Sequence, residues 1–218
     1  MDSIQTQYAT HTVDIEYTLC DLLEIINSTG DNLEGNCFYY HLSTNRFNEL
    51  LGKQLNLFWC GQQGKTRICE IGFNAGHSAY LMLLGREKAP LEFTIFDICE
   101  HKYVKPCLEY IKRVFNTVNY ELVEGDSTKT MPTWIESHPA LEGTYDVVHV
   151  DGGHTEECIT SDLFNAKRLV KKGGILIIDD TNNPIINKKV DELLKEQNYE
   201  EIILFPTVGY EHRMIRKN

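Results

Sequence analysis

From residue 65 onward the chain alternates between short β-type runs and amphipathic segments, and this alternation constrains the fold more than any other feature. Apolar and β-branched residues predict seven strands, at residues 67–71, 91–98, 120–123, 145–150, 175–178, 201–205 and 209–215. Helical spacing predicts helices at residues 76–84, 105–115, 155–170 and 186–196. Because strands that are separated by helices pair in parallel, the pattern predicts an open, mostly parallel α/β sheet.

The last two predicted strands are an exception to parallel pairing. Only residues 206–208 separate them, which is too short for a crossover connection, so we expect the final strand to be antiparallel. Residues 171–174, with the sequence KKGG, predict a helix end before the strand at 175–178.

Residues 1–64 have a different pattern. Apolar side chains recur at helical spacing over residues 13–27 and again over 44–59, and the Gly- and Asn-containing segment 30–36 joins them. We interpret residues 1–64 as a helical cap that belongs to the same domain as a core of residues 65–218, since 218 residues suit one domain.

Composition excludes several classes of protein and partner. With 42% hydrophobic and 24% charged residues, the chain is neither disordered nor fibrous. The net charge of −11 repels polyanions, which disfavours nucleic acid and anionic membrane surfaces as partners. We find no signal peptide and no membrane span, and the odd number of cysteines, 7, contains no CxxC pair. We therefore expect a cytoplasmic protein with free thiols.

The segment after the first predicted strand has the features of a ligand-binding loop. Gly72 and Gly76 would let the backbone turn sharply, but their G-x-x-x-G spacing does not match the dinucleotide fingerprint. Glu70 precedes the loop, where it would repel a pyrophosphate and attract an ammonium group. Asp97 ends the next strand, where a carboxylate can accept both hydroxyls of a ribose. The pattern favours a cationic ligand that carries an amino acid.

These residues, followed by residues 124–127 (EGDS) and Asp151, resemble the class I S-adenosylmethionine-dependent methyltransferases over about residues 65–217. The resemblance implies a Rossmann-like fold and S-adenosylmethionine as methyl donor. It also implies that Glu70 and Gly72 contact the methionine moiety, that Asp97 holds the ribose, and that Asp126 meets the adenine amino group. The candidate donor-binding residues are Glu70, Gly72, Phe73, Asn74, Gly76, His77, Ser78, Asp97, Gly125, Asp126, Ser127 and Asp151.

Acidic residues also end the strands at 145–150 and 175–178. Asp151 follows the first of these strands, and Asp179 and Asp180 follow the second. Because neighbouring parallel strands bring their carboxyl ends together, the three carboxylates are expected to converge and to repel one another. A hard divalent cation relieves such repulsion, and oxygen ligands suit Mg²⁺ or Mn²⁺. We predict a metal site at Asp151, Asp179 and Asp180.

This cluster is similar to that of metal-dependent small-molecule O-methyltransferases. The pair Asp179 and Asp180, with Asp151-x-x-His154 before it, most resembles the branch that acts on sugar hydroxyls, whereas catechol-type enzymes more usually have Asp-Asn. The resemblance implies a small-molecule hydroxyl acceptor, with a sugar or polyhydroxylated compound ahead of a phenol. Asp151 and His154 are the candidate catalytic residues, with His154 as the general base.

Alternatives stay open at this point. His154 could open the following helix, Asp180 could cap a helix that starts near residue 183, and Asp162 could have a structural role. If the acids do not converge, the chain could be a metal-independent N- or O-methyltransferase of a macromolecule. A donor-binding protein without turnover is the non-enzymatic alternative. The exposed face of the helical cap makes a homodimer plausible.

Overall fold

The computed structural model describes residues 2–39, 48–86, 90–208 and 211–218. Its centre is one seven-stranded sheet with the order β3-β2-β1-β4-β5-β7-β6, which confirms the predicted Rossmann-like fold class. The described strands are β1 (Arg67–Ile71), β2 (Leu91–Asp97), β3 (Val118–Glu124), β4 (Tyr145–Val150), β5 (Val170–Ile178), β6 (Tyr199–Ile202) and β7 (Arg213–Lys217).

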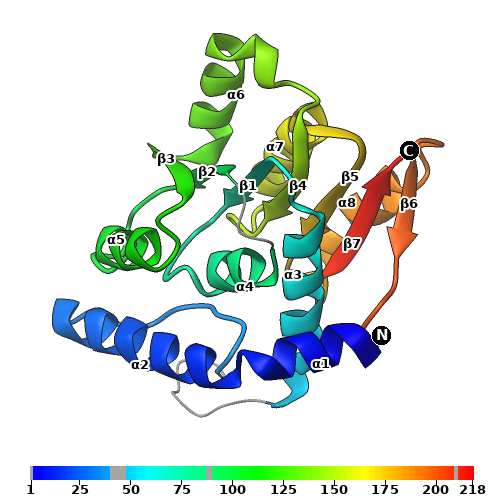
Figure 1. Ribbon diagram of the computed structural model, residues 1–218. Helices are drawn as coiled ribbons and strands as arrows, with labels where there is room; N and C mark the ends of the chain where they lie inside the picture. The colour runs from blue at the N-terminus through cyan, green and yellow to red at the C-terminus, as the bar shows by residue number, and fades with distance from the viewer. Residues whose placement is uncertain (1, 40–47, 87–89, 209–210) are drawn as a thin grey trace.

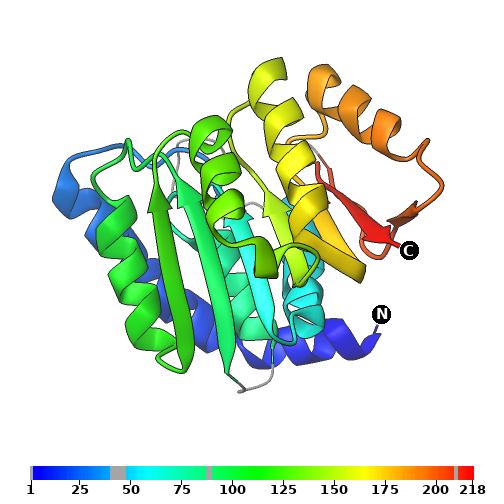
Figure 2. The same cartoon turned by 90° about the horizontal axis from the view of Figure 1, so that it is seen from above.

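Helices cover both faces of the sheet (Figure 2). The strands alternate their apolar side chains between two cores: Ile175 and Ile177 belong to one, Leu176 and Ile178 to the other. On the first face lie α3 (Leu51–Gln63), α4 (His77–Gly85) and α5 (Val104–Val114). On the second face lie α6 (Ser127–Ser137), α7 (Glu156–Leu169) and α8 (Pro184–Leu193). Burial on both faces explains why β4 is buried along its whole length.

The carboxyl-terminal edge is the antiparallel part of the sheet. As predicted, β7 runs antiparallel, and it lies between β5 and β6. Both terminal strands differ in extent from the prediction: β6 ends at Ile202, and β7 begins only at Arg213. Pro206, which has no N–H for a ladder hydrogen bond, lies in the segment between them. Residues 209 and 210, part of the predicted last strand, lie outside the described residues.

Several other elements differ from the sequence pattern. Two helices had no prediction: α1 (Asp2–Thr10) and α6, whose polar sequence contains Pro132 and whose first turn is capped by Asp126. The KKGG segment is not a helix end, because α7 stops at Leu169 and residues 171–174 already belong to β5. A register shift between β4 and β5 accommodates this early strand start.

The N-terminal helices form a layer beneath the first face of the sheet (Figure 1). The helix predicted at 13–27 is α2 (Thr12–Thr29), and α2 contacts α5 while α1 contacts α3. The predicted helix at 44–59 begins, among the described residues, with a 3-10 turn η1 (Asn48–Leu50) and continues as α3; residues 44–47 lie outside the description. A second 3-10 turn, η2 (Pro139–Leu141), follows α6. No described helix has the length and hydropathy needed to cross a bilayer.

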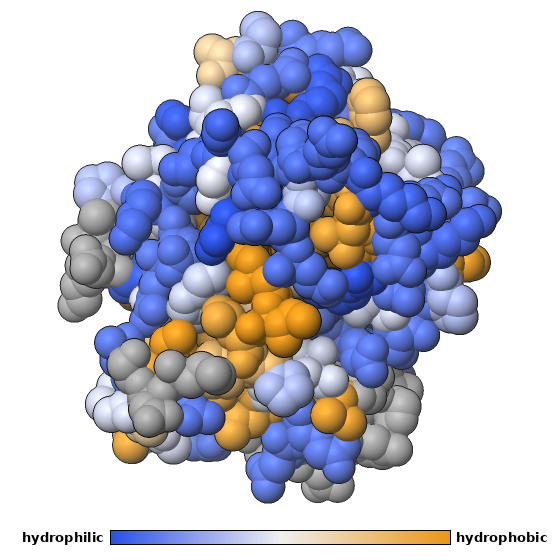
Figure 3. All heavy atoms as spheres, turned by 90° about the vertical axis from the view of Figure 1, so that its right-hand side faces the viewer, coloured by the Kyte–Doolittle hydropathy of each residue, from blue (hydrophilic) through white to orange (hydrophobic). Residues whose placement is uncertain are grey.

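The side of the molecule that carries β6 and β7 exposes hydrophobic side chains within a mostly hydrophilic surface (Figure 3). Ile203, directly after β6, is 81% exposed. The functional residues predicted from the sequence lie elsewhere, at the carboxyl ends of the strands.

Candidate active site

A pocket of about 430 Å³ lies at the carboxyl ends of β1, β4 and β5. Loops that leave these strands form one wall, and the segment before α3 forms the other. Among the predicted site residues, the pocket is lined by Gly72, Phe73, Asn74, His77, Ser78, Asp151, His154, Asp179 and Asp180. Tyr39, an aromatic side chain that could contribute a wall for a substrate ring or the adenine, also lines the pocket. The sequence did not indicate the other lining residues, Glu34, Gly35, Asn36, Cys37, Lys53, Ala75, His101 and Gly152.

The loop after β1 requires its glycines. Gly72 has a φ of +85°, and a Cβ on it would lie 2.0 Å from the carbonyl oxygen of Asp151. Gly76 has a φ of +79°, and a Cβ there would meet the Phe73 ring at 2.5 Å. Left-handed backbone and close backbone approach both favour glycine. The Gly72 turn therefore holds the β1 and β4 loops in direct contact.

Asp97 shapes this loop. One carboxylate oxygen accepts hydrogen bonds from the amides of Phe73 (2.8 Å) and Asn74 (2.9 Å), and the other accepts from the amide of Cys99 (2.6 Å). The side chain is buried and does not line the pocket. Its predicted contact with a ribose stays a prediction, and the structure adds a role in fixing the glycine loop.

Glu70 lies beneath the loop and is completely buried. Its Oε1 accepts a hydrogen bond from Ser78 Oγ at 2.6 Å and lies 2.9 Å from His149 Nδ1. Its Oε2 has no hydrogen-bond partner among the described residues. A buried carboxylate with one oxygen unsatisfied is a source of negative potential below the loop. Contact with a donor's methionine moiety is still a prediction.

The third predicted donor segment follows β3. The Gly125 amide donates to the Asp97 carbonyl at 2.9 Å, so this loop lies beside the end of β2. Asp126 caps α6 by accepting from the Thr128 amide and also pairs with Lys129. Neither these two predicted residues nor Ser127 line the pocket. Their assignment to the adenine is untested by the geometry.

The acids after β4 and β5 lie close together, but among the described residues Asp179 and Asp180 do not join Asp151 in one group of three. The described residues contain two groups whose ligand atoms lie within 4.8 Å of one another, and Asp151 belongs to both: His149, Asp151 and Asp179, and Asp151, His154 and Asp180. Burial and the nearby Asp179 carboxylate raise the pKa of Asp151 well above its ordinary value. Carboxylates this close repel one another, and a cation bound between them would relieve the repulsion. Their oxygen atoms are ligands that suit a hard cation.

His154 and Asp180 form an ion pair at the mouth of the cluster. His154 Nε2 lies 2.7 Å from Asp180 Oδ2, and this hydrogen bond raises the pKa of His154. The imidazole is 60% exposed and is accessible to a ligand. Asp180 has a φ of +53°, an uncommon conformation for a residue other than glycine. Thr155 caps α7 and Asn183 caps α8, so neither His154 nor Asp180 serves as a helix cap.

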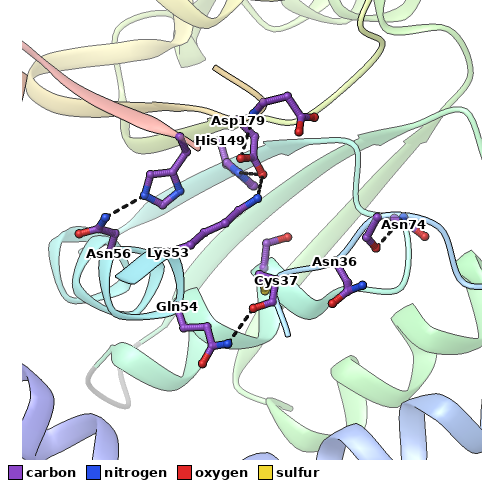
Figure 4. Close-up of polar contacts among 12 residues, drawn as sticks. Asn36, Cys37, Lys53, Gln54, Asn56, Asn74, His149 and Asp179 are labelled. Atoms are coloured by element: carbon purple, nitrogen blue, oxygen red, sulfur yellow. Dashed lines mark hydrogen bonds and ion pairs between the residues drawn. The ribbon is translucent and has the colours of Figure 1, made fainter. Parts of the chain in front are cut away.

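Asp179 has a partner that the sequence analysis missed. Lys53 reaches from α3 so that its Nζ lies 2.5 Å from Asp179 Oδ2 (Figure 4). Although burial raises the pKa of Asp179, the Lys53 ammonium lowers it to about 2. Lys53 lies on the same helical face as Leu57 and Cys60, which are both buried. A lysine on an otherwise apolar helix face is the sequence signal that could have predicted a buried ion pair here.

A buried polar chain continues from Asp179 into the protein. His149, fully buried in β4, lies between Glu70 and Asp179, and its Nε2 is 4.0 Å from Asp179 Oδ2. His212, which burial keeps at a pKa of about 3, contacts the Asn56 side chain of α3 at 2.9 Å. The glycine loop, β4 and α3 are therefore joined by polar contacts below the pocket.

The segment before α3 is attached to the glycine loop. The Asn74 side-chain amide donates to the carbonyls of Glu34 and, at 3.3 Å, Gly35. The Tyr103 hydroxyl accepts from the Glu34 amide at 3.3 Å. Asn74 has a φ of +52°, which aims its side chain at this segment. The segment before α3 is thereby held over the side of the pocket that the glycine loop forms.

Asp162 of α7 lies behind the Asp151 loop and has a structural effect that can be measured. It is 1% exposed, and neither oxygen has a hydrogen-bond partner among the described residues. Burial raises its pKa to about 6. A folded-state pKa above the unfolded value means that the stabilising protonated form is lost as the pH rises through about 6. Asp162→Asn is therefore expected to raise the free energy of unfolding at pH ~7.5 by about 1–3 kcal/mol, with little change near pH ~4.

Urea denaturation at both pH values measures this effect, and Asp146→Asn is the matched control. Although burial raises the pKa of Asp146, hydrogen bonds from Lys171 and from the Thr66 and Arg67 amides lower it overall. Asp146→Asn is expected to destabilise the protein at pH ~7.5, the opposite sign. Equal effects of the two substitutions at that pH would contradict the prediction for Asp162.

Comparison with known protein families matches the part of the chain that contains this pocket. Residues 69–181, slightly more than half of the chain, match a family described as a methyltransferase domain. Similar solved structures include an O-methyltransferase from Bacillus cereus in complex with SAH (18% identity, TM-score 0.63, 91% of this chain and 89% of that chain). TomG, an O-methyltransferase of tomaymycin synthesis from Streptomyces achromogenes in complex with SAM, has 15% identity and a TM-score of 0.60 over 91% and 87%.

CalS11, a TDP-rhamnose 3'-O-methyltransferase of calicheamicin biosynthesis, has 17% identity and a TM-score of 0.57 over 92% of this chain and 93% of that chain. At these identities the structural similarity establishes the fold. No curated protein sequence gave a significant match.

Proposed function

The chain belongs to the methyltransferase-domain family, and on this premise we propose that it transfers a methyl group from S-adenosylmethionine to a hydroxyl oxygen of a small molecule. The observation that carries the proposal is the meeting of the Gly72 loop with Asp151, His154 and Asp180 around one pocket. A methyl donor and an acceptor must both reach such a point, because the methyl group moves directly between them.

The electrostatics of the pocket support a cationic donor. S-adenosylmethionine carries a sulfonium and an ammonium group, and the pocket lies above the buried carboxylate of Glu70. Asp151 lies against the glycine loop through its backbone, since its amide donates to the Ile71 carbonyl at 2.9 Å. Negative groups on both sides of this loop favour a positively charged ligand over a phosphate-bearing one.

We propose that Asp151 and Asp180 hold a divalent cation, Mg²⁺ or Mn²⁺, beside the donor. The fit is supported by the ligand atoms of Asp151, His154 and Asp180, which lie within 4.8 Å of one another. Mg²⁺ is commonly bound through one or two carboxylates, with other oxygens completing the shell. When bound, such a cation supplies a Lewis acid that lowers the pKa of an acceptor hydroxyl.

We propose a sugar or another polyhydroxylated compound as the acceptor, with a phenol as the second choice. The similar structure CalS11 is a TDP-rhamnose 3'-O-methyltransferase, and Asp180 stands where catechol-type enzymes more usually have asparagine. The half-exposed, polar side chains of His154 and Asp180 suit hydroxyl groups that need hydrogen-bond partners.

In the proposed mechanism His154 is the general base. Asp180 orients its imidazole through Nε2, which leaves Nδ1 to accept the acceptor's hydroxyl proton. The hydroxyl oxygen then forms a bond to the donor methyl carbon while the carbon–sulfur bond breaks, and its electron pair stays on sulfur as the neutral thioether. The proton from the hydroxyl group stays on His154 and is later released to solvent. Because the pKa of His154 is raised, the imidazole is protonated in a larger fraction of the molecules, and it must lose this proton before it can act as a base.

Calorimetric titration tests the donor and cation proposals separately. Wild type is expected to bind S-adenosylmethionine and Mn²⁺. Asp151→Ala is expected to weaken Mn²⁺ binding by about 10–100-fold or more, because it removes a charged ligand from a two-carboxylate site. Unchanged Mn²⁺ binding in Asp151→Ala would exclude the cation site, and absence of S-adenosylmethionine binding to wild type would exclude the proposed donor.

We also propose a homodimer through the exposed face of α2. Val13 and Tyr17 on this face are 64% and 70% exposed. Sedimentation velocity of wild type and of a Val13→Glu, Tyr17→Glu double variant tests it: a dimer that persists in the variant would exclude this face, since two buried carboxylates without partners oppose association.

A further inference from the structure

Lys53 affects how many carboxylates of the acidic cluster are free to bind a cation. The lysine is 5% exposed, and it comes from the helical cap rather than from the sheet. Its ammonium lies 2.5 Å from Asp179 Oδ2, while Asp179 Oδ1 accepts the Asp180 amide at 3.0 Å. Both oxygens of Asp179 therefore have partners within the protein.

The charges around Lys53 explain why a lysine is stable in this position. Burial by itself disfavours an ammonium group, but the Asp179 carboxylate lies 2.5 Å from it and compensates its charge. The lysine therefore stays charged and forms a buried ion pair. Such a pair is costly to break by removing one partner, because the remaining charge stays buried without compensation.

The pair divides the acids of the cluster. Lys53 forms its ion pair with Asp179, whereas no described residue forms an ion pair with the Asp151 carboxylate. Asp180, whose φ is +53°, pairs with His154 and not with Lys53. All three acids line the pocket, but Asp179 is only 4% exposed and both of its oxygens already have partners within the protein.

We propose that Lys53 is a built-in cation that permanently neutralises Asp179 and thereby limits a divalent ion to Asp151 and Asp180. Lys53 is in this sense a positioning residue: it acts through Asp179 and sets how many carboxylates the ion can use. The inference rests on the proposed function, since it concerns the same cation site. It also links the helical cap to that site, because α3 supplies the charge.

Removing the ammonium tests the proposal with Mn²⁺ alone, in the full chain, without donor or acceptor. Lys53→Met keeps the length of the side chain and frees Asp179, so Mn²⁺ is expected to bind at least about tenfold more tightly than to wild type, because a third carboxylate joins the site. In the double variant Lys53→Met, Asp179→Asn this gain is expected to disappear. Lys53→Arg, which keeps the charge, is expected to bind Mn²⁺ like wild type.

Lys171→Met is the matched control. Lys171 also pairs with a buried aspartate, Asp146, but at the opposite end of β4. This variant is expected to lose stability without any change in Mn²⁺ affinity, which separates a general effect of breaking an ion pair from the specific one.

Thermal unfolding with and without Mn²⁺ covers the case in which Lys53→Met folds poorly. Mn²⁺ is then expected to restore folding of this variant and to raise its melting temperature more than that of wild type, since a ligand stabilises the state it binds. Mn²⁺ affinity that is unchanged or lower in Lys53→Met, or a gain that persists in the double variant, would overturn the proposal. Mn²⁺ binding to Lys53→Met but not to wild type would support it and contradict the cation in the proposed function.

Discussion

Gly72→Ala is expected to destabilise the protein by about 2–5 kcal/mol. A left-handed backbone costs a residue with a Cβ about 1–2 kcal/mol, and overpacking typically adds about 1–3 kcal/mol. Both apply here, because the φ of Gly72 is +85° and its Cβ would lie 2.0 Å from the Asp151 carbonyl oxygen. The loops have little freedom to separate, since the Gly72 amide donates to the Phe96 carbonyl at 2.8 Å.

Urea denaturation measures the stability change, and calorimetry with S-adenosylmethionine measures the loop's function. Donor binding is expected to fall by about tenfold or more, which corresponds to about 1.4 kcal/mol. Gly143→Ala is the matched control: its φ is +66°, but no atom lies within 4 Å of an added Cβ. It should cost about 1–2 kcal/mol and leave donor binding unchanged. Equal costs at the two glycines would contradict the close approach of the β1 and β4 loops.

His154→Ala is expected to lower the rate constant of methyl transfer by about 10²–10⁴-fold, the usual contribution of a positioned general base. The fold should be little affected, because the imidazole is 60% exposed and its described contact is the ion pair with Asp180. The rate is measured as release of S-adenosylhomocysteine with a sugar or polyhydroxylated acceptor that the wild-type enzyme methylates. Added imidazole is expected to restore part of the lost rate.

His138→Ala provides the control for this prediction. His138 lies at the end of α6, where it stacks on Trp134 and does not line the pocket. The control variant is expected to keep the wild-type rate. A His154→Ala enzyme with the wild-type rate, or a lowered rate that imidazole does not restore, would argue against proton transfer to His154.

The sheet was predictable because its information is local. Strand-forming runs such as 145–150 and helical segments such as 155–170 identify themselves by their own periodicity, and the structure places β4 and α7 there. Two helices with a weak pattern of apolar residues were not predicted: α6 is polar and contains Pro132, and α1 has little amphipathic character. Helices of this kind are stabilised by capping and by tertiary contacts, such as the packing of Trp134 on Phe96.

For the candidate site residues, the positions were predictable from local patterns and the contacts were not. Gly72, Asp151 and Asp180 line one pocket, as their places after the strands suggested, because parallel strands bring their carboxyl ends to one edge of the sheet. Roles were harder to predict. Asp97 and Asp126 were expected to contact the donor, which stays a prediction. The structure shows that Asp97 accepts hydrogen bonds from amides of the Gly72 loop and that Asp126 accepts one from the Thr128 amide of its own loop. Whether a carboxylate oxygen meets a ligand or an amide depends on loop conformation, which residue type does not specify.

By itself, the sequence determined the alternating sheet, the antiparallel end, the glycine loop and the acids that follow successive strands. The tertiary structure alone decided which polar groups are paired: Lys53 with Asp179, Asp180 with His154, and Glu70 with Ser78. Periodicity describes how one segment folds, whereas an ion pair between α3 and the end of β5 depends on how two segments far apart in the chain pack. In a buried site this pairing sets the charge of each group, because little solvent is present to compensate it.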